Sequence, residues 1–305
     1  MVPNYELISE VYLYSSGYLR AKELAKKIVS TFKLSSEQLS SQSHYDFGMR
    51  SVKSVLYASK KLKRTFGDTI TEDKLLLRAL EDVNVPKFLK EDIPLFKNII
   101  KDLFPKVQRP ASDLDDLIAK IKHNSELANL KPTESFLNKV IQLYDTIQVR
   151  HGLMLVGPAG GGKSKTWKIL QQSISDLNDE QRFFKTESVV CNPKSITKDQ
   201  LFCELDRNTN EYLNGIIPLN IMRINQENRQ DVRNWIIFDG PVDTLWIEDL
   251  NSVLDDSKKL CLSSSAIIKL SDTITMMFEV EDLVHASPAT VSRCGMVFIE
   301  PDRRA

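Results

Sequence analysis

The feature that most constrains the fold is a glycine-rich stretch in the middle of the chain. It matches the pattern G-x-x-x-x-G-K-[ST] and lies between a short apolar run at 153–156 and a stretch with helical spacing at 165–177. A strand that passes through such a loop into a helix is an arrangement that surrounds phosphate groups with backbone N–H groups. The predicted phosphate-binding loop comprises Gly157, Pro158, Ala159, Gly160, Gly161, Gly162, Lys163 and Ser164.

Each part of this loop has an expected role. The glycines let the backbone curl so that its N–H groups face the β-phosphate of a nucleotide, and the helix that follows from Lys165 adds its positive end. Lys163 is expected to bridge the β- and γ-phosphates, and the hydroxyl of Ser164 to ligate Mg²⁺. We therefore predict binding of ATP or ADP with Mg²⁺. The alternative is a glycine-rich turn between strand and helix that binds nothing.

A phosphate site of this kind also needs a carboxylate at the end of a neighbouring strand, which holds the metal through its water shell. Asp239 is the predicted carboxylate, because it closes the apolar run 235–238. The alternative is that Asp239 is an ordinary turn residue.

The first half of the chain has the spacing of amphipathic helices. From residue 5 to about residue 130, apolar side chains recur every three or four positions, as in Leu77, Leu80 and Val83. Glycines and prolines divide this region into several helices, and the polar stretch 35–43 is predicted to be a loop. We expect no strand here, and a helix over 134–150 is expected to lead into the second half.

The second half alternates short apolar runs with helical stretches, which predicts an α/β fold with a parallel, doubly wound sheet. Its ligand crevice is expected beyond the carboxyl ends of the strands. Residues 260–262 and 267–270 have the pattern of a short hairpin. The predicted organisation is an all-α helical unit at 1–85 followed by an α/β domain at 86–305. The predicted strands are 153–156, 188–191, 235–238, 276–280 and 296–299.

Composition restricts the partners. The chain has 41 Lys and Arg against 41 Asp and Glu, so no overall field attracts it to nucleic acid or to an anionic membrane. Its four cysteines form no C-x-x-C pair and are expected to be reduced and mostly buried. There is no apolar run near the ~18 residues of a membrane span and no signal-peptide order, so we expect an intracellular protein. Met1 before Val2 and Pro3 is expected to be an initiator added to an excised fragment.

Several long segments resemble dynein heavy chains. The run Trp235-Ile236-Ile237-Phe238-Asp239-Gly240-Pro241-Val242-Asp243 is similar to the second of that motor's six AAA+ modules, as are the phosphate loop with Trp167 and the segments 192–194, 245–248, 253–256 and 286–296. Residues 36–40 and 44–50 are similar to the small helical subdomain that ends the first module. The resemblance covers nearly the whole chain and is closer to axonemal than to cytoplasmic dyneins.

The resemblance implies a fragment that joins the lid of the first module, about 1–85, to the large α/β subdomain of the second. In the family the first module is the main ATPase, and the second binds ATP with little or no hydrolysis. Gly240 supports this, because hydrolytic AAA+ proteins usually have Glu there to polarise the attacking water. The expected partners are the other AAA+ modules, other dynein chains and, through the parent motor, the microtubule. The expected location is the cytoplasm and cytoskeleton, in the axoneme of a cilium or flagellum.

Two arginines gain expected roles through the same resemblance. Arg50 resembles a lid arginine that senses the γ-phosphate in the first module, and Arg293 resembles the arginine finger that one module offers to its neighbour. Both are thus predicted to act in trans, at a site whose phosphate loop is outside this chain. The alternatives are an arginine in the first turn of a solvated helix and a surface arginine before a strand. A polar residue that approaches the γ-phosphate is expected near Glu281.

The sequence leaves two other functions open. A self-contained ATPase or kinase would need Asp243 or Glu248 to position the water in place of a residue at Gly240. A nucleic-acid-remodelling protein would need a basic channel lined with aromatic side chains, and the neutral charge balance argues against it.

Overall fold

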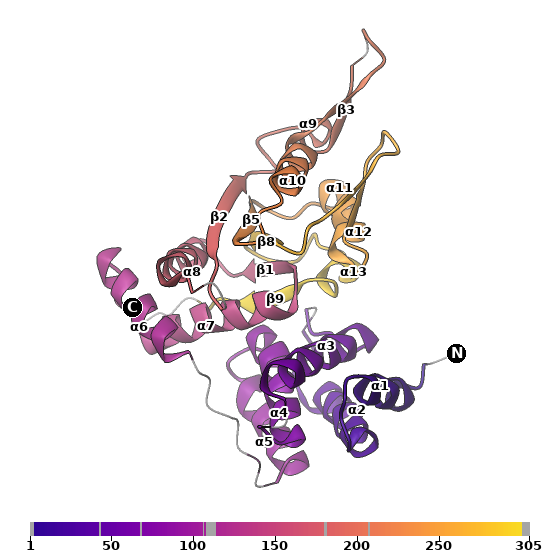
Figure 1. The fold of residues 1–305 in the computed structure, drawn as a ribbon, viewed down its shortest axis with the longest axis vertical. Coiled ribbons are helices and arrows are strands. Elements are labelled where there is room, and N and C mark those ends of the chain that lie inside the picture. The colour runs from indigo at the N-terminus through magenta and orange to yellow at the C-terminus, as the bar shows by residue number, and fades with distance from the viewer. Residues whose placement is uncertain are drawn as a thin grey trace. The chain divides into compact units, whose positions relative to one another are not determined.

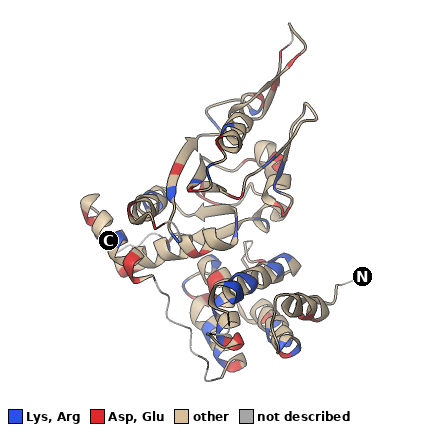
Figure 2. Cartoon of the chain, viewed as in Figure 1, with Lys and Arg blue, Asp and Glu red and all other residues tan. Residues whose placement is uncertain are grey.

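The computed structural model describes residues 3–42, 44–67, 69–105, 107, 114–179, 182–206 and 208–300. The chain forms two compact units, residues 1–113 and residues 114–305 (Figure 1). Lys and Arg as well as Asp and Glu occur on helices of both units (Figure 2). No helix in the described part of the chain is long and apolar enough to cross a membrane.

The described residues of unit 1 form helices and loops and no strand, as predicted. Its core is formed by the helix faces that carry apolar side chains at three- and four-residue spacing, for example Leu24, Ile28 and Phe32. Its elements are α1 (Tyr5–Ser15), α2 (Ala21–Gln38), α3 (Met49–Phe66), α4 (Glu72–Asn84), η1 (Val85–Lys87) and α5 (Asp92–Leu103).

The prediction of a loop over 35–43 was wrong for its first part, because α2 continues to Gln38. Ser35 is 1% exposed and continues the buried stripe of α2, so a polar residue occupies a position that faces the core. Residues 39–42 have no regular structure, and Ser43 lies outside the described residues.

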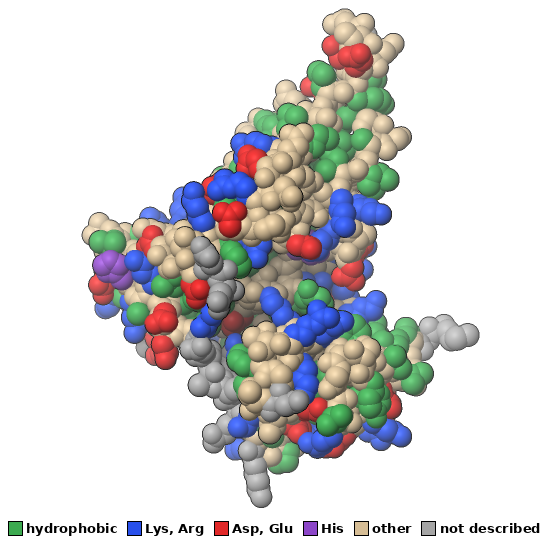
Figure 3. Space-filling model, in the orientation of Figure 1, with side chains coloured by type: hydrophobic (Ala, Val, Ile, Leu, Met, Phe, Trp, Pro, Cys, Tyr) green, Lys and Arg blue, Asp and Glu red, His purple; other side chains and the backbone are tan. Residues whose placement is uncertain are grey.

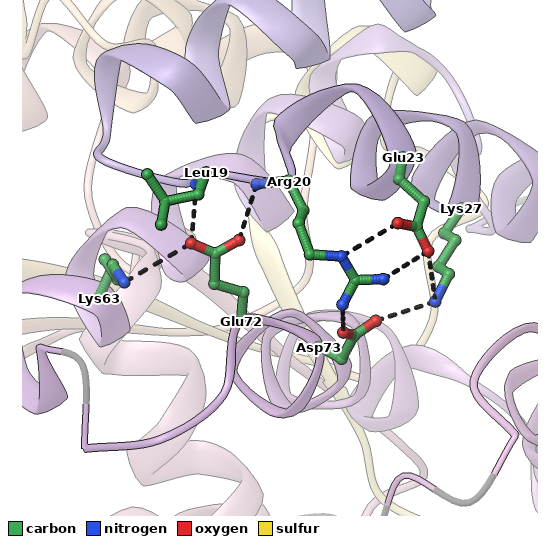
Figure 4. A network of polar contacts seen from close by, with 7 residues as sticks. All are labelled: Leu19, Arg20, Glu23, Lys27, Lys63, Glu72 and Asp73. Atoms are coloured by element: carbon green, nitrogen blue, oxygen red, sulfur yellow. Dashed lines mark hydrogen bonds and ion pairs between the residues drawn. The ribbon is translucent and has the colours of Figure 1, made fainter.

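A network of charged groups joins the start of α2 to the start of α4 (Figure 4). The carboxylate of Glu72 accepts hydrogen bonds from the backbone N–H groups of Leu19 at 2.8 Å and Arg20 at 3.0 Å. Asp73 accepts from the side chains of Arg20 and Lys27. Carboxylates in the first turn of α4 also interact favourably with the positive end of that helix.

A second network fixes the segment that precedes α3. The carboxylate of Asp92 is 4% exposed and accepts from the Ser40 hydroxyl at 2.5 Å and from the Tyr45 hydroxyl at 2.7 Å. Burial alone would raise the pKa of Asp92, but the hydrogen bonds from Ser40 and Tyr45 outweigh it and lower that pKa. The contacts hold α5 against the segment that leads to Gly48, the N-cap residue of α3.

Unit 2 is an α/β domain built on five parallel strands in the order β2-β5-β8-β1-β9, which confirms the predicted fold class. Its first elements are α6 (Asp115–Leu127), α7 (Glu134–Val149), β1 (Gly152–Val156), α8 (Lys163–Leu177), β2 (Lys185–Cys191), α9 (Lys198–Leu201), β3 (Cys203–Leu205), β4 (Tyr212–Asn214) and α10 (Ile216–Glu227). The others are β5 (Val232–Asp239), α11 (Thr244–Ile247), η2 (Glu248–Leu250), α12 (Asn251–Leu254), β6 (Lys259–Cys261), β7 (Ile267–Lys269), β8 (Ile274–Val280), α13 (Pro288–Val291) and β9 (Gly295–Phe298).

Side chains of the central strands alternate between two cores, one on each face of the sheet. Leu153 and Leu155 of β1 pack in the core that includes residues of α6, α7 and α8. Met154 and Val156 pack in the other core, with residues of α10, α11 and α12. Because both faces are covered, the strands are continuous apolar runs, and this is why they could be recognised in the sequence.

Two antiparallel hairpins extend from this domain. The β6–β7 hairpin was predicted, whereas the β3–β4 hairpin was not. Figure 3 shows hydrophobic side chains on the surface of the arm that carries the β3–β4 hairpin, where Leu205, Tyr212 and Leu213 are exposed.

The packing boundary between the units lies between residues 113 and 114, beyond the predicted boundary at 85/86. The helix α5 packs against α2, so residues 92–103 are part of the helical unit in the structure. The assignment of residues from 86 onward to the second AAA+ module does not depend on this packing and stays a prediction.

Candidate nucleotide-binding site

The glycine-rich loop begins where β1 ends, between the carboxyl ends of two neighbouring strands. The N–H of Gly157 donates to the carbonyl of Val280 at the end of β8 at 3.1 Å, and the N–H of Ile299 donates to the carbonyl of Val156 at 2.7 Å. The loop therefore lies at the carboxyl ends of the strands, where a parallel α/β fold binds its ligands.

The loop conformation depends on glycine at two positions. Gly160 has φ +77° and Gly162 has φ +93°. Residues other than Gly rarely adopt this backbone conformation. A Cβ atom at either residue would meet nothing within 4 Å, so the requirement for glycine at these positions is conformational and not steric. The helix α8 starts directly afterwards at Lys163, and its first N–H groups have no carbonyl partner within the helix. Such an end attracts anions.

The side chain of Lys163 folds back over the loop. Its Nζ atom donates to the carbonyl oxygens of Gly157 at 2.6 Å and Pro158 at 2.9 Å. The ammonium group is thus held at the loop that would surround the phosphates. Phosphate oxygens are stronger acceptors than these carbonyls because they are charged.

Ser164 makes a contact that was not foreseen. Its hydroxyl donates to Oε2 of Glu279 on β8 at 2.6 Å, and Nε1–H of Trp167 donates to Oε1 of the same carboxylate at 2.5 Å. Glu279 is 4% exposed and Trp167 is 3% exposed. A buried carboxylate therefore lies directly beside the loop, where sequence reasoning had expected a polar residue near Glu281. Glu281 itself is exposed and follows the end of β8.

Asp239 ends β5, as predicted, and its side chain is exposed. It pairs in register with Glu279 on β8, so the two acidic residues lie on adjacent strands at the same level. The following residue, Gly240, lies close to the turn after β2, because a Cβ at Gly240 would be 3.1 Å from Oδ1 of Asn192.

The two acids proposed as substitutes for a catalytic glutamate have different surroundings. Asp243 is the N-cap residue of α11, and its carboxylate accepts from the N–H of Leu245 at 3.0 Å. Glu248 starts η2 and is exposed. The capping bond gives Asp243 a structural role that needs no contact with water at the phosphate loop.

Arg293 is held within its own unit. Its Nε donates to Oδ1 of Asp255 at 2.8 Å, and its Nη1 donates to the carbonyl of Ala289 at 2.8 Å. The side chain is 18% exposed. The neighbouring Cys294 is buried, and burial raises the pKa of its thiol to about 12. Arg50 is in the first turn of α3 in unit 1, as predicted, and is half-buried.

The cysteines are free, as expected, although they are not all buried. Cys203 and Cys294 are buried, Cys191 is half-buried and Cys261 is exposed on β6.

Among the described residues no group of three or more His, Cys, Asp and Glu side chains is placed to hold a metal ion. Mg²⁺ commonly binds proteins through one or two oxygen ligands together with the phosphates of a nucleotide. The donors offered here, the Ser164 hydroxyl and the nearby carboxylates, fit that pattern.

A parallel sheet, a glycine-rich loop at its carboxyl edge and a helix that begins at the Lys–Ser pair define a P-loop nucleotide-binding domain. Two family models match the chain: the hydrolytic ATP binding site of the dynein motor region over residues 1–164, and the AAA domain of the dynein-related subfamily over residues 152–294. The chain belongs to the dynein motor family.

Individual relatives agree with this. The chain is 53% identical to dynein axonemal heavy chain 1 of Rattus norvegicus, 51% identical to dynein axonemal heavy chain 6 of Homo sapiens and 48% identical to dynein axonemal heavy chain 3 of Homo sapiens. Each match covers 99% of this chain and 7% of the relative. The chain therefore spans a small part of the length of these relatives.

Proposed function

We propose that this chain is a part of an axonemal dynein motor that holds MgATP at its phosphate loop with little or no hydrolysis. The observation that carries the proposal is Gly240, which follows Asp239 directly and has no side chain that could orient or deprotonate a water molecule. Positioning of the nucleophile is a large part of phosphoryl-transfer catalysis. The bound nucleotide then acts structurally or as a regulator.

The residues that would hold the nucleotide are those of the loop, Gly157 to Ser164, with Lys165 in the first turn of α8. Lys163 would contact the β- and γ-phosphates, and Ser164 and Asp239 would hold Mg²⁺, directly or through its water shell. The bound ion would neutralise charge that develops on the phosphates.

The chain would also serve its neighbours in the motor. In this proposal Arg50 and Arg293 are supplied in trans to the main ATPase site of the preceding module. The partners are the other AAA+ modules of the heavy chain, other dynein chains and, through the parent motor, the microtubule. Nucleic acid and membrane are not partners. The names of the similar proteins place them in the axoneme, and we propose the same location for this chain.

The test is to denature the purified chain and identify the nucleotide that it releases, and then to follow the fate of ATP added to a nucleotide-free sample. We expect a stoichiometric amount of released ATP or ADP and a turnover far below the roughly 1–10³ s⁻¹ of typical enzymes. Absence of any bound nucleotide, with no binding of added MgATP, would contradict the proposed site.

A self-contained ATPase is the alternative, in which Asp243 or Glu248 positions the water. It predicts measurable turnover by the chain alone that disappears in Asp243→Asn or Glu248→Gln. The bond between Asp243 and the N–H of Leu245 favours the first proposal, because it gives this carboxylate a capping role.

The trans role of Arg293 can be measured only in the parent heavy chain, where the neighbouring site is present. Arginine fingers contribute about 10³-fold or more to turnover, so Arg293→Ala is expected to lower the ATPase rate by at least about this factor. Arg229→Ala is the matched control, since within the described residues Arg229 forms surface ion pairs with Glu187 and Glu227. An unchanged ATPase rate in Arg293→Ala would overturn the trans role of this residue.

A further inference from the structure

Glu279 is a buried acid with two specific partners on one helix. It lies in β8, the middle strand of the sheet, and is 4% exposed. Oε2 accepts from the Ser164 hydroxyl and Oε1 accepts from the Trp167 indole, so both oxygens of the carboxylate are occupied from α8. A buried carboxylate is costly unless it is hydrogen-bonded, which makes the partners of Glu279 a defined arrangement.

Asp239, on the adjacent strand, differs from Glu279 in both its exposure and its hydrogen bonding. Its side chain is exposed, and within the described residues the structure records no hydrogen bond or ion pair to its carboxylate. The Ser164 hydroxyl donates its single proton to Glu279. Of the two acids that share this level of the sheet, Glu279 is thus the one that orients the hydroxyl at the proposed metal position.

We propose that Glu279 is the positioning carboxylate of the Mg²⁺ site and that it couples the metal ligand Ser164 to Trp167. This inference rests on the proposed nucleotide binding. With its proton directed to Glu279, the Ser164 hydroxyl keeps its lone pairs for the metal. The carboxylate also strengthens the oxygen as a ligand, as groups that hydrogen-bond to metal ligands commonly do.

The variant Glu279→Gln separates this role from simple packing. Trp167 Nε1–H can only donate, so the amide oxygen of a Gln must face Trp167 and the NH₂ group must face Ser164. Ser164 then accepts a hydrogen bond through a lone pair, and its proton turns away from residue 279. The volume of the side chain hardly changes, whereas the direction of the hydrogen bond at the metal ligand is reversed.

The test measures the affinity of a fluorescent ATP analogue across a MgCl₂ series and in EDTA. Loss of a group that orients a metal ligand costs about 10–100-fold in metal affinity, so Glu279→Gln is expected to raise the Mg²⁺ concentration required by this factor. Affinity in EDTA is expected to stay near that of the native chain. Equal weakening with and without Mg²⁺ would show that Glu279 acts only through packing and would overturn the inference.

Two further variants complete the design. Trp167→Phe removes one hydrogen bond to Glu279 but leaves the bond from Ser164, so its Mg²⁺ dependence is expected to be native. The double variant Ser164→Ala/Glu279→Gln is expected to require no more Mg²⁺ than Ser164→Ala alone, because both substitutions act on one metal ligand. Additive losses would overturn the coupling.

Failure of this inference differs from failure of the proposed function. A native chain that binds the analogue with a Mg²⁺ dependence unchanged in Glu279→Gln overturns the role of Glu279 and leaves the nucleotide site intact. A native chain that binds no analogue overturns both. If Glu279→Gln does not fold, Glu279→Asp provides the second variant. It keeps the charge but is too short to reach both partners, and it is expected to show the same selective loss in Mg²⁺.

Discussion

Lys163→Ala is expected to abolish nucleotide binding at concentrations that saturate the native chain. Hydrogen bonds to charged groups contribute about 1.5–3 kcal/mol each, so loss of two phosphate contacts weakens binding by at least about 100-fold. A ligand present at 100 times its Kd stabilises the native state by about 2.7 kcal/mol, and this stabilisation is expected to disappear in the variant. The measurement is thermal unfolding with and without MgATP, together with a binding titration.

The control for Lys163→Ala is Lys259→Ala, which makes the same change at an exposed position on the β6–β7 hairpin. It is expected to keep both affinity and stabilisation by MgATP. In the structure Lys163 donates to the carbonyls of Gly157 and Pro158, so Lys163→Ala is expected to lower the free energy of unfolding slightly, by about 0.5–1.5 kcal/mol. A melting temperature that still rises normally with MgATP in Lys163→Ala would contradict the assignment of the loop.

The fold was largely predictable because unit 2 combines a local motif with doubly covered strands. The phosphate loop is contiguous in sequence, so its pattern predicts its conformation. Each central strand is an apolar run because both faces of the sheet are packed, and the structure extends most of the predicted strands by only a few residues, as at 152–156 and 232–239.

Where prediction failed, the sequence carried a weak or misleading local signal. The strands of the β3–β4 hairpin have three residues each and mostly exposed side chains, so no buried face leaves a periodic pattern. The stretch 35–38 is polar, yet it is helical because Ser35 continues a stripe set by the apolar residues before it.

The candidate site divides in the same way. The position of the loop after β1 and of Asp239 at the end of β5 could be predicted from motif and context, whereas the contact between Ser164 and Glu279 joins residues 115 positions apart. A lone acid inside the apolar run 276–280 was the signal that could have indicated it, because an unpaired carboxylate would not be tolerated in a central strand. The bond between Arg293 and Asp255 likewise arises from tertiary packing.

Gly157→Ala is expected to cause the largest loss of stability among substitutions in the loop. A Cβ at this position would stand 2.2 Å from the carbonyl oxygen of Ile299, a backbone atom beside the β1–β9 pairing. The N–H of Ile299 donates a hydrogen bond to the carbonyl of Val156. Relief of the clash must therefore shift either the segment at the end of β9 or the loop itself. We expect a loss of about 1–3 kcal/mol from the clash alone. Nucleotide affinity is expected to fall as well, because the loop backbone must keep its position.

Gly160 provides the comparison that identifies the cause, because its constraint is conformational rather than steric. A side chain there meets open space but must adopt φ +77°, so Gly160→Ala is expected to cost about 1–2 kcal/mol. Asn visits the left-handed region more readily, so Gly160→Asn is expected to be more stable than Gly160→Ala, whereas Gly157→Asn gains nothing over Gly157→Ala. Urea unfolding of the four nucleotide-free variants measures this difference. If Gly157→Asn recovered stability as Gly160→Asn does, the close approach of Ile299 would not be the reason that position 157 requires glycine.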